Sequence, residues 1–239
     1  MIELGCNSMS KEIDLLPLIE KYKSDYEDFD LLRRHIVDFF SLHPRAKPYV
    51  HSVKSRLKDP DHLKDKIIRK WDLNNPITTE NLYEKITDFS GVRVLLLHQK
   101  QFSEVKNAID WRIKRGEWIK VEEPKAYTWD PEAQSYFENL GLETHRKESS
   151  YTSVHYLIKQ YADSDICCEI QIRTLFEEIW GEVDHVINYP EATTKEGCRD
   201  QILVLAKLIG AGSRLVDSIF SSHQNSGNNA SHTDPSTVE

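Results

Sequence analysis

The chain has 239 residues and a formal net charge of −8, and its 39% hydrophobic and 29% charged residues are typical of a soluble globular protein with one large domain and room for a helical appendage. The acidic charge argues against a protein that coats nucleic acid non-specifically. With no apolar run long enough to span a bilayer and no leader pattern, we expect a cytoplasmic protein without a membrane partner.

Helical patterns open the chain. Apolar residues recur at helical spacing over residues 10–24 and 26–42, and Pro44 ends the second pattern. Each predicted helix therefore has one face to bury. We expect residues 1–48 to form an N-terminal helical segment that packs on the body of the domain.

Basic residues are concentrated in the next segment. Residues 49–58 are predicted to be extended or irregular, and Asp59-Pro60-Asp61 forms a turn that starts a helix to about Trp71. This part of an otherwise acidic chain holds seven cationic side chains: Lys54, Arg56, Lys58, Lys64, Lys66, Arg69 and Lys70. The asymmetry indicates a polyanion bound at one place, although a solvated helix face explains the charges equally well.

The middle of the chain mixes strand and helix patterns. Residues 86–97 are the most hydrophobic segment and are predicted to form a central strand, because their near-continuous apolar end fits burial on both faces. We predict helices over 79–85, 101–115 and near 132–139, and a short strand over 118–121. The rest of 122–150 gives no clear pattern.

A predicted hairpin and two helices complete the chain. Residues 151–158 and 166–173 alternate polar and apolar side chains around a turn at 163–165, which predicts an antiparallel pair. Thr174 is the predicted N-cap of a helix to about Val186 that turns Phe176, Ile179, Trp180 and Val183 inward. A C-terminal helical extension (191–221) has its helix over 199–220, with an apolar stripe of Ile202, Leu205, Leu208, Ile209 and Leu215. Residues 222–239 are a predicted disordered tail, and the order of elements predicts an α+β fold.

One strand of the hairpin has an unusually polar face. With a period of two, Glu169, Gln171 and Arg173 lie on one side of residues 168–174, and apolar residues lie on the other. Taken alone, this strand is best interpreted as half-solvated. However, the preceding strand repeats the arrangement with Tyr151 and His155. Two neighbouring strands thus offer ligand-type side chains, which indicates a binding site.

Two carboxylates on different strands suggest a metal site. Asp88, at the start of the hydrophobic strand, and Glu169 can bind Mg²⁺ while leaving coordination positions for water and substrate phosphates. Nearby guanidinium and ammonium groups, such as that of Arg93, can carry the remaining phosphate charge. This set of residues is typical of phosphoryl or nucleotidyl transfer. A GxxxxGK[ST] motif is missing, which excludes a P-loop enzyme.

Five motifs, in this order, resemble those of the RelA/SpoT-type alarmone synthetase family. They are Arg56-Leu57-Lys58 with Lys66, Asp88-x-x-Gly91-x-Arg93, Tyr151-x-Ser153-x-His155, Glu169-Ile170-Gln171-Ile172-Arg173-Thr174 and Trp180-x-x-x-Asp184-His185. The resemblance implies a nucleotidyltransferase-like mixed β-sheet flanked by helices over residues 49–190. It also implies transfer of the β,γ-pyrophosphate of ATP to the 3′-hydroxyl of GDP or GTP, which makes (p)ppGpp.

The resemblance also implies a role for each motif residue. Asp88 and Glu169 match the catalytic acids that bind Mg²⁺, and Glu169 is either a metal ligand or the base for the acceptor hydroxyl. Tyr151 and His155 match acceptor-binding positions, where the tyrosine stacks on guanine. The ATP-binding set is Arg56 and Arg93, which match the arginines on either side of adenine, the phosphate-binding Lys58 and Lys66, and Gln171 and Arg173.

The chain departs from the family pattern at three positions. His62 stands where serine is usual, Ser150 where glycine often precedes the tyrosine, and Asp184 where glutamate is usual. Asp184 and His185 are interpreted as anchors of their helix, slightly ahead of a direct catalytic role. The family's hydrolase domain needs a long preceding helical domain, so we expect a synthetase without its own hydrolase.

Three functions stay open at this point. The first is the pyrophosphokinase that makes (p)ppGpp. The second is a toxin-type member that pyrophosphorylates the 3′ end of tRNA or an adenine nucleotide, against which the acidic charge weighs mildly. The third is a catalytically silent nucleotide-binding regulator, which the pairing of Asp88 with Glu169 disfavours. Because stand-alone members of the family are often tetramers, the resemblance also implies a homo-oligomer of this kind.

Overall fold

A mixed seven-stranded sheet forms the centre of the protein, seen in a computed structural model that describes residues 14–147, 149–189 and 191–229. Its main path runs β1 (Ser52–Leu57), β2 (Ser90–Leu96), β7 (Cys168–Thr174), β6 (Ser153–Lys159), β4 (Lys125–Thr128) and β5 (Glu143–Arg146), and β3 (Ile119–Lys120) pairs with β6. The pairs β2–β7 and β4–β5 are parallel and the others antiparallel. The predicted α+β class with a mixed sheet is confirmed, as is the β6–β7 hairpin.

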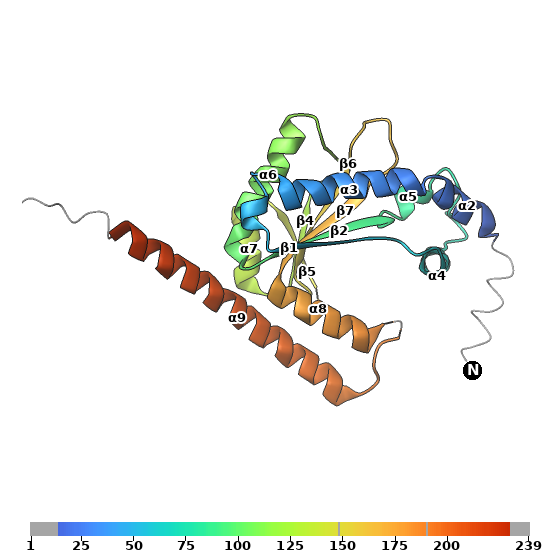
Figure 1. Ribbon diagram of the computed structural model, residues 1–239. Coiled ribbons are helices and arrows are strands. Elements are labelled where there is room, and N and C mark those ends of the chain that lie inside the picture. Colours follow the sequence, from blue (N-terminus) through green and yellow to red (C-terminus); the bar gives the residue numbers. More distant parts are fainter. Residues whose placement is uncertain (1–13, 148, 190, 230–239) are drawn as a thin grey trace, which may run out of the picture.

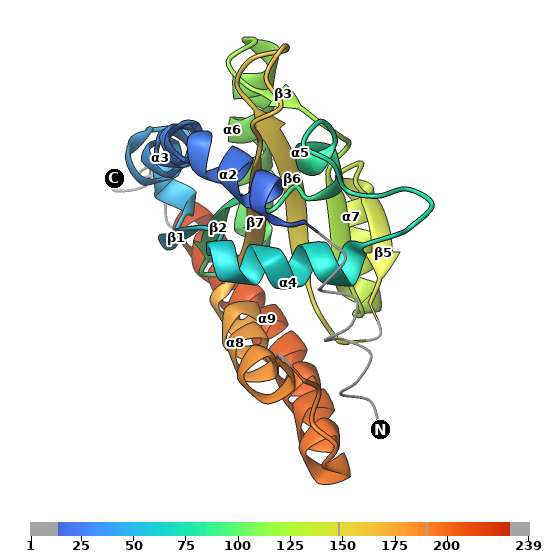
Figure 2. The ribbon, with the colours of Figure 1, turned by 90° about the vertical axis from the view of Figure 1, so that its right-hand side faces the viewer.

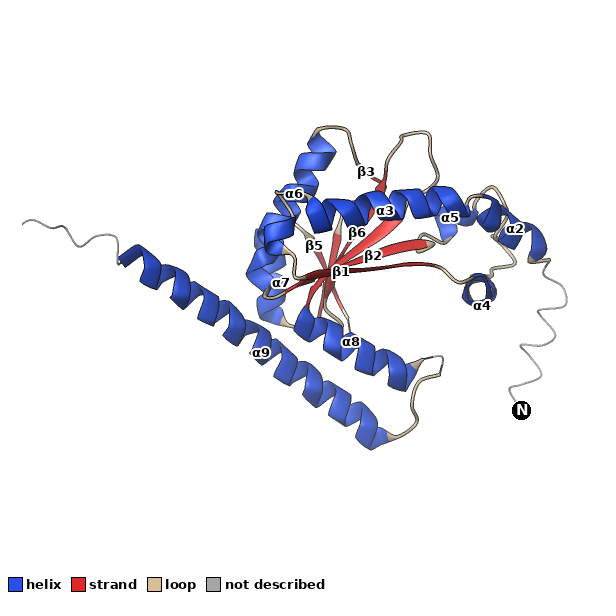
Figure 3. Cartoon of the chain, viewed as in Figure 1, coloured by secondary structure: helices blue, strands red, loops and turns tan. Residues whose placement is uncertain are grey.

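Helices lie on both sides of this sheet (Figures 1 and 3). On one side, α3 (Tyr26–Leu42) packs against β1 and β2, and α6 (Phe102–Lys114) and α7 (Pro131–Asn139) share the same core. The 3-10 turns η1 (Lys47–Tyr49) and η2 (Gln99–Gln101) connect these elements. The apolar side chains of the central strands face this layer, so the opposite face of the sheet is left for polar residues.

A second core joins the N-terminal helices to the basic segment. It holds α2 (Leu16–Ser24), α4 (Pro60–Lys70) and α5 (Leu82–Lys85), with Tyr22, Phe29 and Phe89 in ring contact at its centre. The Asp59 carboxylate caps α4 by accepting from the backbone amides of Asp61 and His62, as the turn predicted. Figure 2 shows α4 in front of the sheet. The cations of α4 are therefore fixed beside the entrance of β2.

Helices α8 (Leu175–Asn188) and α9 (Glu196–Asn229) cover part of the polar side of the sheet. Thr174 caps α8 as predicted, in a reciprocal capping box with Glu177. The predicted inward face is wrong at Ile179 and Val183, which are exposed, whereas Trp180 is buried. The reason is that α8 turns acidic side chains toward the cations of the sheet, so its buried face is only partly apolar.

The predicted stripe of α9 is also partly wrong. Leu208 and Leu215 are exposed, and the buried stripe follows 202, 206, 209, 213 and 217, with small and polar residues at several of these positions. Asp217 belongs to it because its carboxylate contacts Nδ1 of His98 at 2.8 Å. The helix continues to Asn229 through the first residues of the predicted disordered tail, while residues 230–239 lie outside the described part. None of the described helices has the length and apolar character needed to cross a bilayer.

Candidate active site

Charged and polar side chains from four strands meet on the face of the sheet opposite α3 and α6. Backbone pairing sets Lys54 beside Arg93, Arg93 beside Gln171, and Gln171 beside His155. Directly paired residues point to the same side of a sheet. A row of ligand-type residues thus runs across β1, β2, β7 and β6, as the two polar strand faces predicted.

A cleft of about 590 Å³ opens over this row. Its floor includes Arg56, Asp88, Arg93, Tyr151, Glu169, Gln171 and Arg173, and its wall is formed by residues of α8 with Tyr189. The volume suits a ligand of nucleotide size. Seven of the ten predicted site residues line the cleft, and the other three, Lys58, Lys66 and His155, contact residues that do.

Asp88 is held by two lysines at the start of β2. Lys58 Nζ lies 2.9 Å from Oδ2 and Lys66 Nζ lies 2.6 Å from Oδ1. Burial opposes ionisation of the carboxyl group, but the hydrogen bond from Lys58 and the charges of both lysines outweigh it and hold the pKa of Asp88 below its usual range. Asp88 is therefore a carboxylate at neutral pH, at the place where the basic segment meets the cleft.

Glu169 belongs to a chain of polar contacts that crosses two strands. Its Oε1 lies 3.1 Å from Nδ1 of His155, and its Oε2 accepts from Gln171 Nε2 at 2.7 Å. The hydroxyl of Tyr151 lies 2.9 Å from Nε2 of the same histidine. A proton on Nδ1 satisfies both contacts, because His155 then donates to the carboxylate and accepts from the tyrosine.

Glu169 and Tyr151, at the two ends of this row of contacts, have opposite protonation states. Burial works against the charge of Glu169, but His155 and Gln171 hold its pKa below the usual range. Burial raises the pKa of Tyr151 despite the charge of Arg173, so its hydroxyl keeps its proton. The site thus contains two ionised acids, Asp88 and Glu169, that sense each other's charge.

The donor set of these acids fits a divalent cation. Asp88 Oδ1 is buried and accepts no well-aligned hydrogen bond from the described residues, although Lys66 lies close. Oxygen ligands from one or two carboxylates, completed by water and phosphates, are what Mg²⁺ requires. The described residues contain no cluster of three or more His, Cys, Asp or Glu side chains able to hold a metal. A cation here would need the substrate as a further ligand.

A buried acid that the sequence did not reveal contacts three of the cations that line the cleft. Glu178 of α8 is 5% exposed and contacts Lys54, Arg93 and Arg173 at 2.8, 3.3 and 2.9 Å. The exposed Glu182, one turn further along, also reaches Arg93 at 2.6 Å. No local pattern marks Glu178, because its partners come from three separate strands.

The end of α8 faces the cleft rather than anchoring the helix. Asp184 and His185 both line the cleft. Asn188 donates to Oδ1 of Asp184 at 2.8 Å, and the ring of His185 stacks on Tyr189 with centroids 4.6 Å apart. His62 of α4 approaches the same tyrosine edge to face at 6.5 Å. The interpretation of Asp184 and His185 as anchors to the sheet is therefore not supported.

Ser150, which precedes the site tyrosine, has a strained backbone. Its φ of 60° lies in the left-handed region, which favours glycine. The chain thus keeps the turn conformation for which glycine is the usual residue, and Tyr151 is still delivered into the cleft. The departure from the family pattern at this position leaves the local geometry in place.

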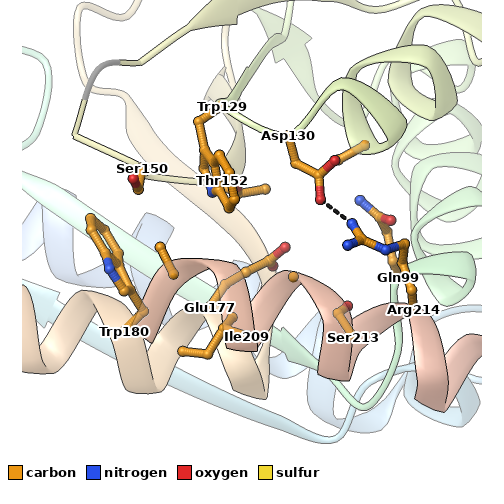
Figure 4. Close-up of a pocket in the computed structure, with 13 residues that line it drawn as sticks. Gln99, Trp129, Asp130, Ser150, Thr152, Glu177, Trp180, Ile209, Ser213 and Arg214 are labelled. Atoms are coloured by element: carbon orange, nitrogen blue, oxygen red, sulfur yellow. Dashed lines mark hydrogen bonds and ion pairs between the residues drawn. The ribbon is translucent and has the colours of Figure 1, made fainter. Parts of the chain in front are cut away.

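A second, much smaller cavity lies under α9 (Figure 4). It measures about 30 Å³ between Trp129, Trp180 and the helix, with Arg214 paired to Asp130 at its edge. That volume holds about a water molecule. It is too small for a nucleotide, and the cleft over the sheet remains the candidate active site.

Sequence comparisons relate this chain to a known protein family. Residues 55–194 match the model of the region found in RelA/SpoT proteins. The chain is 24% identical over 187 residues to GTP pyrophosphokinase YwaC of Bacillus subtilis strain 168, covering 74% of this chain and 79% of that protein.

Solved structures share the fold at low sequence identity. A GTP pyrophosphokinase family protein from Streptococcus pneumoniae is 20% identical with a TM-score of 0.63, covering 88% of this chain and 96% of that one. Small alarmone synthetase 1 from Bacillus subtilis is 18% identical with a TM-score of 0.60, covering 87% and 97%. The latter protein has also been solved with its product pppGpp and with AMPCPP.

Proposed function

Because the chain belongs to the RelA/SpoT family, we propose that it is an ATP-dependent pyrophosphokinase that makes (p)ppGpp from GDP or GTP. The observation that carries the proposal is the convergence of Asp88 and Glu169, both ionised, with Arg56 and Arg93 in one nucleotide-sized cleft. Two related proteins support the proposal further. One is a GTP pyrophosphokinase, and the other is a small alarmone synthetase solved with AMPCPP and with pppGpp.

The donor half of the cleft would hold ATP. Arg56 pairs in register with Gly91, two residues from Arg93, so two guanidinium groups on neighbouring strands are available to stack on adenine. Lys58 and Lys66 stand beside Asp88, where they would bind the β- and γ-phosphates once a cation takes over part of that carboxylate's charge. Gln171 and Arg173 line the floor between the two halves.

Asp88 and Glu169 would hold Mg²⁺ together with the phosphates of ATP. The bound ion would supply charge neutralisation for the transferred pyrophosphate. The protein's own contribution is to keep both acids ionised and to aim them from adjacent strands, since Glu169 pairs in register with Gly91, three residues beyond Asp88.

The acceptor half would hold the guanine nucleotide. Tyr151 offers a ring for stacking, held by its contact with His155. Asp184 lines the same cleft, and a carboxylate suits the adjacent N1–H and 2-amino donors of guanine, neither of which adenine has. This carboxylate favours a guanine over an adenine acceptor.

Transfer then needs one proton acceptor and one leaving group. The acceptor's 3′-oxygen forms a bond to the β-phosphorus of ATP, the bond from that phosphorus to the bridging oxygen of the α-phosphate breaks, and AMP leaves with the electron pair. Glu169 is the carboxylate placed to take the proton of the 3′-hydroxyl, or to stabilise the site as a metal ligand. His155 holds Glu169 in place through its Nδ1 contact.

Labelled ATP tests the proposal directly. The protein is incubated with Mg²⁺ and γ-labelled ATP, with GDP, GTP, ATP or tRNA added separately, and the labelled product is identified. We expect label on the guanine nucleotides with equimolar AMP release, and none with a Glu169→Ala variant. Label on tRNA, or on an adenine nucleotide that has gained a 3′-pyrophosphate, would instead identify a toxin-type member. Nucleotide binding without AMP release would identify a silent regulator.

A further inference from the structure

Glu178 contacts two cations on the proposed donor side and a third, Arg173, on the floor between the two halves of the cleft. Its Oε1 lies 2.8 Å from Lys54 Nζ and 3.3 Å from Arg93 Nη1, and its Oε2 lies 2.9 Å from Arg173 Nη2. The three cations come from β1, β2 and β7, whereas Glu178 comes from α8. One carboxylate therefore links the helix to three adjacent strands of the site.

The two oxygens of Glu178 serve different sides. Oε1 faces Lys54 and Arg93, which sit next to Arg56 on the proposed donor side. Oε2 faces Arg173, whose Cζ lies 5.9 Å from the centre of the Tyr151 ring on the proposed acceptor side. When Oε1 loses a cation, more of the negative charge of the carboxylate is therefore available to the cation at Oε2.

The ion pair between Glu178 and Arg173 is shielded from water. The side chains of Glu178 and Arg173 are 6% and 3% exposed, so water screens their attraction little. Arg173 Nε and Glu178 Oε2 are both buried without a hydrogen-bond partner among the described residues, so the 2.9 Å ion pair is the contact by which Glu178 holds this guanidinium. Lys54, in contrast, is 56% exposed and free to turn toward a ligand.

We propose that Glu178 is a positioning residue that couples the binding of the two nucleotides, an inference that rests on the proposed function. ATP draws Lys54 and Arg93 toward itself and away from Oε1. The charge of Glu178 then falls on Arg173 alone, which fixes the guanidinium against Tyr151 and prepares the ring for the acceptor. By thermodynamic reciprocity, the acceptor must increase the affinity for ATP by the same factor.

Calorimetry with an unreactive donor measures this coupling. AMPCPP carries a methylene group in place of the bridging oxygen at which transfer would break ATP, so it forms a stable ternary complex with Mg²⁺ and GDP. For the wild type we expect GDP to bind about 5-fold or more tightly when AMPCPP is saturating. In Glu178→Gln that ratio is expected to fall to about 1.

Glu182→Gln is the matched control. Glu182 lies on the same helix and contacts the same Arg93, but it is 53% exposed, and among the described residues its ion pair is with this donor-side arginine. Its removal is expected to change AMPCPP affinity alone and to keep the coupling ratio of the wild type. A loss of coupling in Glu182→Gln equal to that in Glu178→Gln would contradict a specific role for the buried acid.

Lys54→Met tests the mechanism and leaves Glu178 with two of its three cations, Arg93 and Arg173. It removes one donor-side partner of Glu178 and so imitates the effect of ATP. GDP affinity without AMPCPP is expected to rise about 2- to 3-fold and the coupling ratio to shrink accordingly, because the acceptor-binding state is then already partly populated. This variant keeps the test decisive if Glu178→Gln does not fold, since unchanged GDP affinity and unchanged coupling in Lys54→Met would overturn the inference.

Failure of this inference and failure of the proposed function look different. If the wild type binds AMPCPP and GDP with a ratio of 1, or if Glu178→Gln keeps the wild-type ratio, the coupling role is wrong while pyrophosphate transfer still stands. If the wild type binds neither nucleotide, both proposals are wrong.

Discussion

A Cβ atom on Gly181 would lie 2.6 Å from Nη1 of Arg173. Real Cβ atoms do not approach other atoms that closely, so the guanidinium occupies space that exists because α8 carries glycine at this position. Glycine weakens a helix interior by about 1 kcal/mol relative to alanine. The close approach of Arg173 to Glu178 is therefore retained at a cost in helix stability.

Gly181→Ala is expected to separate stability from activity. The added methyl group improves the helix by up to about 1 kcal/mol, but it pushes the tip of Arg173 off Glu178 and away from Tyr151. Because the gain in helix propensity opposes the loss of the buried ion pair, we expect little net change in melting temperature, together with a several-fold loss of kcat/KM for the acceptor nucleotide. Wild-type kinetics in this variant would show that the position of Arg173 does not matter to the reaction.

Asp88→Asn is expected to abolish transfer and to destabilise the fold. Lys58 is 10% exposed, and without the Asp88 charge it would remain as a nearly buried, unpaired cation. Breaking such a pair costs roughly 1–3 kcal/mol. Denaturant melts of Asp88→Asn, Lys58→Met and the double variant measure it.

The double variant is the control for this pair. Replacing both partners removes the nearly buried Lys58 charge and leaves only that of Lys66, which is 23% exposed and can reach water, so the double variant should be more stable than Asp88→Asn alone. Strict additivity of the two single changes would show that the lysine and the aspartate are not coupled.

Glu169→Gln separates two roles for that acid. The glutamine amide keeps a similar shape but can neither take a proton nor neutralise a cation. Turnover is expected to drop at least about 100-fold. Unchanged affinity for AMPCPP in Mg²⁺ would identify Glu169 as the base, whereas a parallel loss of Mg²⁺-dependent affinity would identify it as a metal ligand.

Glu177 predicts a specific dependence of stability on pH. Burial raises the pKa of its carboxyl group to about 7, despite hydrogen bonds from Thr174. Between the ordinary value of about 4.3 and about 7, the folded chain therefore keeps a proton that the unfolded chain has lost. The native state loses stability as pH rises through that window.

Glu177→Gln removes this penalty. The amide oxygen can still accept from the backbone of Thr174, which the carboxylate now does at 2.6 Å. At pH 8 we expect the variant to be roughly 1–3 kcal/mol more stable than the wild type, with the difference vanishing near pH 4. Melting temperatures measured at both pH values check this, and a gain that is the same at both would point to packing rather than charge.

Local periodicity was enough to predict the central part of the site. A period of two placed Glu169, Gln171 and Arg173 on one strand face, and the register of β6 and β7 brings His155 beside them. This works because the side chain of every second residue in a strand points the same way whatever the neighbours are. The motif order then brought Asp88 and Arg93 into the same site before any contact was known.

Features that depend on long-range partners could not be predicted in this way. The strands β4 and β5 are only four residues long and were not predicted, because such short segments mix charged and apolar residues without a clear period. No local pattern identifies Glu178 as a buried acid, because its three partners come from separate strands. The tetramer and the cytoplasmic location stay predictions, and tRNA stays an alternative acceptor.

The pairing of β2 with β7 has a consequence for folding. Ser90 Oγ donates to Cys168 Sγ across this parallel pair, and the two residues are 78 positions apart in sequence. Contacts of such separation carry a large loop-closure cost before any native interaction offsets it, which slows folding. Since Asp88 and Glu169 flank this same junction, the cleft takes shape only when the two halves of the sheet have joined. A nascent or partly folded chain is therefore expected to be inert toward nucleotides until β2 and β7 have paired.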